Sequence, residues 1–124
     1  MAARRQLPTL IVRTRAYSLA AISFYSGLPQ HTVARILGRQ FLRSATSVGA
    51  QYREAQRAKS IADFLSKTEG ALQELDETAY WLELLRESGI DSSATGGAIQ
   101  NETAQLLAIF VAITKKAKAR KLAN

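Results

Sequence analysis

Residues 60–87 decide the fold, and they read SIADFLSKTEGALQELDETAYWLELLRE. Apolar or small side chains recur in this stretch in alternating steps of four and three residues, which places them along one side of a helix. This spacing is typical of the contact line of an antiparallel helical bundle. The positions are Ile61, Leu65, Thr68, Leu72, Leu75, Ala79 and Leu82, and Phe64, Ala71, Thr78 and Leu85 widen the apolar stripe on its flanks.

Three further helices are predicted, because glycine and proline are sparse and helix-forming residues fill the stretches between them. Pro8 suits the first position of the first helix, and Thr32 is a candidate N-cap for the second. Ser60 with Asp63 resembles a capping box, and Gly89 suits the end of the helix that follows. The expected helices cover residues 8–26, 32–57, 60–88 and 98–120, with a loop over residues 89–97.

These elements predict an all-α protein with the architecture of an antiparallel up-down-up-down four-helix bundle. The 124 residues suit a single domain over residues 1–124, with no dividing linker or repeat. Tyr80, Trp81 and Leu84 lie off the apolar stripe, and residues 106–113 are apolar on all sides of their helix. A monomer would leave part of this surface in water, so we expect a homo-oligomer. The alternative is that Trp81 caps one end of the core.

The composition excludes several kinds of chemistry. Without cysteine there is no disulfide or thiolate metal site, and the single His31, expected near a helix start at the surface, cannot supply two imidazoles. The sequence has no glycine-rich phosphate loop, nucleophile elbow or metal-spaced carboxylates, so we expect no enzyme activity, no cofactor and no metal. The longest apolar run, residues 106–113, is much shorter than the roughly 20 residues of a membrane span. We therefore expect a cytoplasmic protein without a membrane segment.

Charge is segregated along the chain, whose net charge is +7. Residues 1–59 carry ten basic groups and one acid, residues 60–88 carry seven acids and two basic groups, and residues 89–124 carry five basic groups and two acids. Five arginines of the second helix fall within about an 80° sector, opposite its apolar side. This arginine ridge consists of Arg35, Arg39, Arg43, Arg53 and Arg57, and the C-terminal basic patch consists of Lys115, Lys116, Lys118, Arg120 and Lys121.

Arginine donates paired hydrogen bonds to phosphate and stays charged, so these two groups predict binding of nucleic acid, RNA or DNA, through backbone phosphates. An oligomer would multiply the positive charge and strengthen the attraction. Other interpretations remain open. The arginines could form a solvated surface, pair with the acidic helix of the same or a neighbouring subunit, or dock an acidic protein on an oligomeric scaffold.

A polar stripe borders the apolar side of the second helix. Polar groups at such a border need partners or water, and Lys67, Glu74 and Thr78 of the following helix are candidate partners. We expect a hydrogen-bond network that fixes helix register; a small polar pocket is the alternative. The network consists of Gln40, Ser44, Ser47, Gln51 and Glu54, with Glu74 from the facing helix.

The chain resembles a bacterial family over most of its length. Residues 42–55, LRSATSVGAQYREA, and the segments SIADF at 60–64 and GALQELDET at 70–78 carry the resemblance. They are similar to the four-helix bundle proteins first noted as open reading frames within intervening sequences of 23S ribosomal RNA genes. Ser47 and Glu54 match the family pattern Ser-Ile-Pro-x-Asn-Ile-x-Glu-Gly. Five positions depart from it: Val48, Gly49, Gln51, Tyr52 and Ala55.

The resemblance implies an up-down-up-down bundle that assembles as a ring-like homopentamer with a basic surface. It also implies a fold similar to the accessory variability determinant of diversity-generating retroelements, a pentamer that binds nucleic acid and its reverse transcriptase. On this basis we expect a pentamer whose partner is nucleic acid or a protein such as a retroelement reverse transcriptase.

Overall fold

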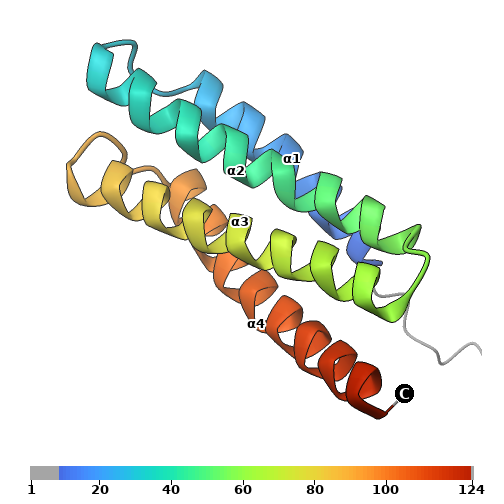
Figure 1. Cartoon of the computed structure of the whole chain (residues 1–124). Coiled ribbons are helices and arrows are strands. Elements are labelled where there is room, and N and C mark those ends of the chain that lie inside the picture. Colours follow the sequence, from blue (N-terminus) through green and yellow to red (C-terminus); the bar gives the residue numbers. More distant parts are fainter. Residues whose placement is uncertain (1–8, 124) are drawn as a thin grey trace, which may run out of the picture.

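The computed structural model describes residues 9–123, which form four helices joined by short turns (Figure 1). The described residues contain no strand. The structure therefore confirms the all-α fold and the four-helix bundle. The helices are α1, Leu10–Ser26; α2, Thr32–Gln56; α3, Ile61–Glu87; and α4, Ala94–Ala123.

Helices that follow one another in the sequence pack side by side and run in opposite directions. In every pair of neighbouring helices, residue numbers rise along one helix while the residues they contact fall along the other, which gives the expected up-down-up-down order. The pairs that establish it are Thr14–Gly49 and Tyr25–Gly38, Arg43–Glu77 and Glu54–Lys67, and Glu69–Lys118 and Arg86–Ser93.

The starts of α1 and α2 differ slightly from the sequence prediction. α1 begins at Leu10, two residues later than expected, and Pro8 lies outside the described residues. His31, rather than Thr32, caps α2, because its Nδ1 accepts a hydrogen bond from the Ala34 N–H at 3.3 Å. An imidazole nitrogen here does what a hydroxyl or carboxylate oxygen usually does at a helix start.

The predicted cap of α3 is confirmed. The Ser60 hydroxyl accepts from the Asp63 N–H at 3.0 Å, and the Asp63 carboxylate accepts from the Lys59 N–H at 3.3 Å. The two side chains thus satisfy backbone donors on both sides of the helix start. At the other end Gly89 adopts a φ of 82°, the left-handed conformation that ends many helices.

α4 begins at Ala94, four residues earlier than expected. The Ser93 hydroxyl accepts from the Gly96 N–H at 3.0 Å and donates to the Asp91 carboxylate at 2.6 Å. Asp91 also binds the Arg86 guanidinium at 2.6 Å. This capped start, held by the contact between Asp91 and Arg86, overrides the low helix propensity of the glycines, so the helix begins inside the predicted loop.

Aromatic rings link the helices in the core. Phe24 of α1 meets Phe41 of α2 edge to face at 5.3 Å between ring centroids. Tyr52 of α2 meets Phe110 of α4 at 5.6 Å in the same manner. Such pairs contribute about 1 kcal/mol beyond the burial of their area. The largest fully buried aliphatic side chains are Leu75, Leu82, Leu85 and Leu106.

The buried line of α3 is rotated from the predicted one. Ala71 and Thr78, expected on the flank, are fully buried, whereas Leu72 and Ala79 are only half-buried. The cause is that α3 packs more extensively against α2 than against α4, which turns Thr78 toward α2. The buried positions are Leu65, Thr68, Ala71, Leu75, Thr78, Leu82 and Leu85.

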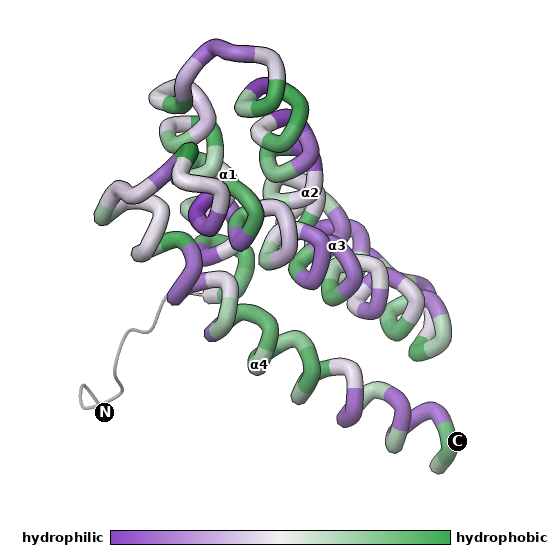
Figure 2. Tube along the Cα trace, turned by 90° about the vertical axis from the view of Figure 1, so that its left-hand side faces the viewer, coloured by the Kyte–Doolittle hydropathy of each residue, from purple (hydrophilic) through white to green (hydrophobic). Residues whose placement is uncertain are grey.

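Several apolar side chains remain exposed. Tyr80 is 53% exposed, and its ring stacks edge to face on Trp81, which packs partly against the core. In the apolar run of α4, Leu106 and Phe110 are buried while Val111 is exposed. Figure 2 shows this hydrophobic middle of α4 giving way to a hydrophilic C-terminal part.

The helices differ in length, so among residues 9–123 only three helices form one end of the bundle. α1 has 17 residues and α4 has 30. Arg13, in the first turn of α1, binds Glu102 and Gln105 of α4, which continues to Ala123. We call the end where α2 stops and α3 starts the α2/α3-turn end; there the last turns of α4 extend beyond α1 (Figures 1 and 2). Contact between α1 and α4 is the least extensive of the four helix pairings.

Candidate functional site

The arginine ridge lies on the outer side of α2. Its five arginines are exposed, while Phe41, Ala45 and Val48 on the opposite side of the helix are fully buried. The amphipathic spacing predicted from the sequence thus places the guanidinium groups in solvent, where they are accessible to an anion.

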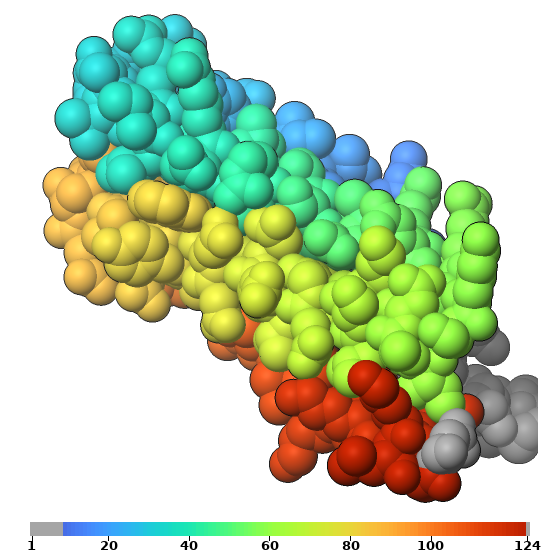
Figure 3. Space-filling model, viewed as in Figure 1, coloured from blue at the N-terminus to red at the C-terminus, as the bar shows by residue number. Residues whose placement is uncertain are grey.

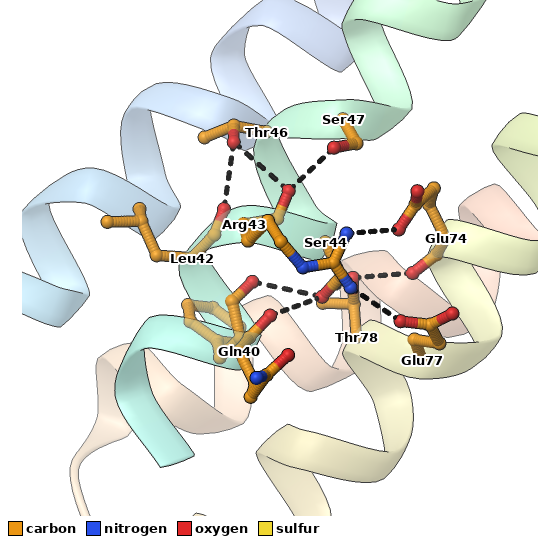
Figure 4. Close-up of polar contacts among 10 residues, drawn as sticks. Gln40, Leu42, Arg43, Ser44, Thr46, Ser47, Glu74, Glu77 and Thr78 are labelled. Carbon is orange, nitrogen blue, oxygen red and sulfur yellow. Dashed lines mark hydrogen bonds and ion pairs between the residues drawn. The ribbon is translucent and has the colours of Figure 1, made fainter. Parts of the chain in front are cut away.

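Arg43 differs from the rest of the ridge, because α3 already holds it. Its Nη2 donates to Glu77 Oε1 at 2.7 Å, and its Nη1 lies 3.5 Å from Glu74 Oε1 (Figure 4). For this residue the interpretation of pairing with the acidic helix of the same chain is correct. Within residues 9–123, the other four arginines, Arg35, Arg39, Arg53 and Arg57, have no carboxylate within 4 Å.

Glu74 is the partly buried carboxylate of this cluster. Burial raises the pKa of its carboxyl, the nearby Arg43 lowers it, and Glu77 raises it again, with a net increase. Its Oε1 is buried and makes no hydrogen bond. Arg43 therefore offsets a carboxylate that the fold has partly desolvated, and it is less available to an external ligand than its neighbours on the ridge.

A further arginine joins the ridge from α1. Arg15 and Arg53 line a cavity of about 350 Å³ between α1 and α2, together with Thr14 and Gly49. Helical periodicity could not reveal this pair, because it depends on how α1 lies against α2. A Cβ at position 49 would stand about 3.5 Å from Thr14, an ordinary van der Waals distance, so α1 and α2 are in contact at this point.

The C-terminal basic patch is exposed throughout. Lys118 lies 3.5 Å from Glu69 of α3. Lys116 and Arg120 line a cavity of about 620 Å³ at the α2/α3-turn end, and Lys59 lines its other side. A cation of the α2/α3 turn thus lines the same cavity as two cations of α4, which the sequence alone could not show.

The predicted polar network makes two kinds of contact: some side chains bridge α2 and α3, and some bind backbone oxygens within α2. The hydroxyls of Ser44 and Thr78 are 2.8 Å apart, and Glu54 pairs with Lys67 at 3.1 Å, so these two positions bridge α2 and α3. The Ser44 and Ser47 hydroxyls also donate to backbone oxygens of Gln40 and Arg43 within α2 (Figure 4).

Gln51 contributes by packing. A Cβ at position 70 would lie within 3 Å of the Gln51 side-chain amide, so Gly70 makes room for it. The contacts across α2 and α3 hold one register between the helices along most of their length.

Within residues 9–123, no group of three or more His, Asp or Glu side chains is arranged to hold a metal ion. None of the described helices is long and apolar enough to cross a membrane.

Fold and surface together define a small helical bundle protein with a basic outer face. The family model described as 23S rRNA-intervening sequence protein matches residues 9–112. The chain therefore belongs to the 23S rRNA-intervening sequence protein family, as the resemblance indicated.

A solved structure agrees with this assignment. It is a protein of unknown function from the S23 ribosomal protein family of Bacteroides thetaiotaomicron, 31% identical to this chain. The similarity covers 86% of this chain and 99% of the other, with a TM-score of 0.78. The comparison with curated proteins found no match.

Proposed function

We propose that the protein is a non-enzymatic, homo-oligomeric bundle, a pentamer, that binds RNA or DNA through backbone phosphates. The observation that carries the proposal is a row of four exposed arginines that have no ion-pair partner within residues 9–123: Arg35, Arg39 and Arg53 on α2 and Arg57 at its C-cap. Guanidinium groups in such a row match the repeating phosphates of a polyanion. Arg15 of α1, which lines a cavity together with Arg53, extends the surface beyond α2.

Oligomer formation is supported by apolar side chains on the outer side of α1. Val12, Leu19 and Ile22 are between 46% and 56% exposed and recur in steps of seven and three, which aligns them along one side of the helix. Buried against another copy, they would leave water.

Nucleic-acid binding is tested by titrating single-stranded RNA and duplex DNA at about 50 and about 200 mM salt. Wild-type affinity should fall steeply as salt rises. In R39Q/R53Q the log–log salt slope should decrease by about one for each phosphate contact that is lost. The matched control is Q73E/Q100E, which changes the net charge equally at exposed positions of α3 and α4. Equal effects of both double variants, or binding that does not respond to salt, would contradict phosphate recognition by the ridge.

The oligomer is tested by light scattering on the full chain. Wild-type protein should have about five times the monomer mass of 13.6 kDa, and L19Q/I22Q should have a lower mass. A wild-type mass near that of one chain at micromolar concentration would disprove the oligomer.

A further inference from the structure

Within residues 9–123, the α2/α3-turn end contains an open groove along which α1 does not extend. α4 continues for 18 residues past Gln105, the last α4 residue that Arg13 of α1 binds, which is roughly 27 Å of helix. The resulting cavity of about 620 Å³ is walled by α2, α3 and α4. Figure 3 shows one wall from outside, where the C-terminal turns of α4 lie beside the start of α3.

The floor of the groove is apolar. Ile61 and Phe64 of α3 face Ile113 and Ala117 of α4, with Ala55 of α2 between them. Ile61, Phe64 and Ile113 are only half-buried, although they lie at positions that a fourth helix would cover in a complete bundle. The surface is thus continuous with the core and has the character of a helix-packing face.

The rim of the groove is cationic. Lys59, Lys116 and Arg120 line it, no carboxylate does, and within residues 9–123 none of these cations is ion-paired. An apolar floor between positive rims is complementary to an amphipathic helix that carries acidic residues beside its apolar stripe. Residues 1–8 of this chain do not match an acidic helix, because they include the cations Arg4 and Arg5 and no acidic residue.

We propose that this groove docks an acidic amphipathic helix of a protein partner. That helix occupies the place that further turns of α1 would take, with its apolar side on Phe64 and Ile113 and its carboxylates beside Lys116 and Arg120. The proposal is independent of nucleic-acid binding by the arginine ridge.

The probe is a fluorescent, helix-forming peptide with leucines at i, i+3, i+4 and i+7 and glutamates on both flanks. A second peptide has lysine in place of each glutamate. The full-length protein should bind the acidic peptide at least about tenfold more tightly than the basic one. Equal affinity for the two peptides, or no binding of the acidic one, would overturn the proposal.

Two pairs of variants locate the site. K116E/R120E should weaken binding of the acidic peptide about tenfold or more. K115E/K121E makes the same charge change at exposed positions of the same helix that do not line the groove, and should have little effect. All four residues are exposed, so folding should be unaffected. I113Q, which changes the floor without changing charge, should also weaken binding. Equal losses in the two charge variants would indicate nonspecific attraction and overturn the proposal.

Further measurements distinguish a protein helix in the groove from nucleic acid or a second copy of the chain. R39Q/R53Q should bind the peptide normally, whatever it does to nucleic-acid affinity. Displacement of the peptide by RNA or DNA would assign the groove to nucleic acid instead, and loss of the oligomer in K116E/R120E would assign it to a second copy. Either result would overturn the proposal for a protein partner.

Discussion

The glycine at position 96 leaves the space that a buried ion pair fills. Asp91, only 8% exposed, receives hydrogen bonds from Arg86 and Ser93 directly beside the first turn of α4. A Cβ at position 96 would overlap the Asp91 carboxylate, whereas one at position 97 would make only ordinary contact with Arg86. These neighbouring glycines therefore have different roles.

We predict opposite effects of alanine at the two positions. G96A should lower the free energy of unfolding by about 2 kcal/mol, since the ion pair must move or the helix start must shift. G97A should leave stability unchanged or raise it by up to about 1 kcal/mol, because alanine favours the helix more than glycine does. Urea unfolding of both variants measures the difference; equal stability of the two variants would show that the ion pair does not fill the space.

Glu74 should make stability depend on pH. Its folded-state pKa lies above the ordinary value of 4.5, so between these two values the folded chain binds more protons here than the unfolded chain. The contribution of this group to stability is fully present below pH 4.5 and is lost as pH rises through the folded-state pKa. E74Q should lack this contribution and should gain stability relative to wild type as pH rises through that range.

The measurement is the difference in unfolding free energy between wild type and E74Q at several pH values. E83Q, at an exposed position of the same helix that has no ion pair within residues 9–123, is the control. A difference that does not change with pH would refute a raised pKa.

The contacts of individual arginines were the least predictable part of the candidate site. Helical spacing located the ridge correctly on the exposed side of α2, because a helix of known period leaves little freedom in direction. Whether one guanidinium meets a carboxylate depends on the register of α3. For that reason only the structure shows that Arg43 is ion-paired and that Arg39 has no such partner within residues 9–123. Arg15 was missed because its position beside Arg53 depends on how α1 lies against α2.

At the scale of single helices, the sequence predicted the fold well wherever a cap could be read from neighbouring residues. Ser60 and Asp63 marked the start of α3 correctly. The start of α4 was wrong because the cap is part of a tertiary cluster in which Asp91 binds Arg86. That contact joins α3 to the loop that precedes α4, so the periodic pattern of α4 alone cannot contain it.

The Ser60 cap should matter for stability. S60A is expected to lower the free energy of unfolding by about 1 kcal/mol, because the Asp63 N–H loses its acceptor. S66A, at an exposed position inside α3, should have no cost, since alanine is the better helix former. Thermal unfolding followed by circular dichroism compares the two, and a cost as large for S66A as for S60A would contradict the role of the cap.

At the scale of the whole molecule, the number and order of helices followed from the sequence, but their relative lengths and contacts did not. The predicted contact line of α3 was rotated because α2 and α4 cover it unequally, with Thr78 facing Ser44 of α2. Helical periodicity treats every side of a helix alike until its neighbours are known. The opening of the groove also depends on neighbouring helices, because it follows from how far the short α1 extends along α4.

The limited contact between α1 and α4 also bears on how the chain folds. Nearly all packing joins helices adjacent in sequence, so each helical hairpin can form without waiting for distant segments, and the low contact order favours fast folding. Docking of α1 on α4, which brings Arg13 to Glu102 across 89 residues, closes the longest loop. Because that closure carries the largest entropy cost for the least contact, the α1–α4 edge is where the folded bundle should open first.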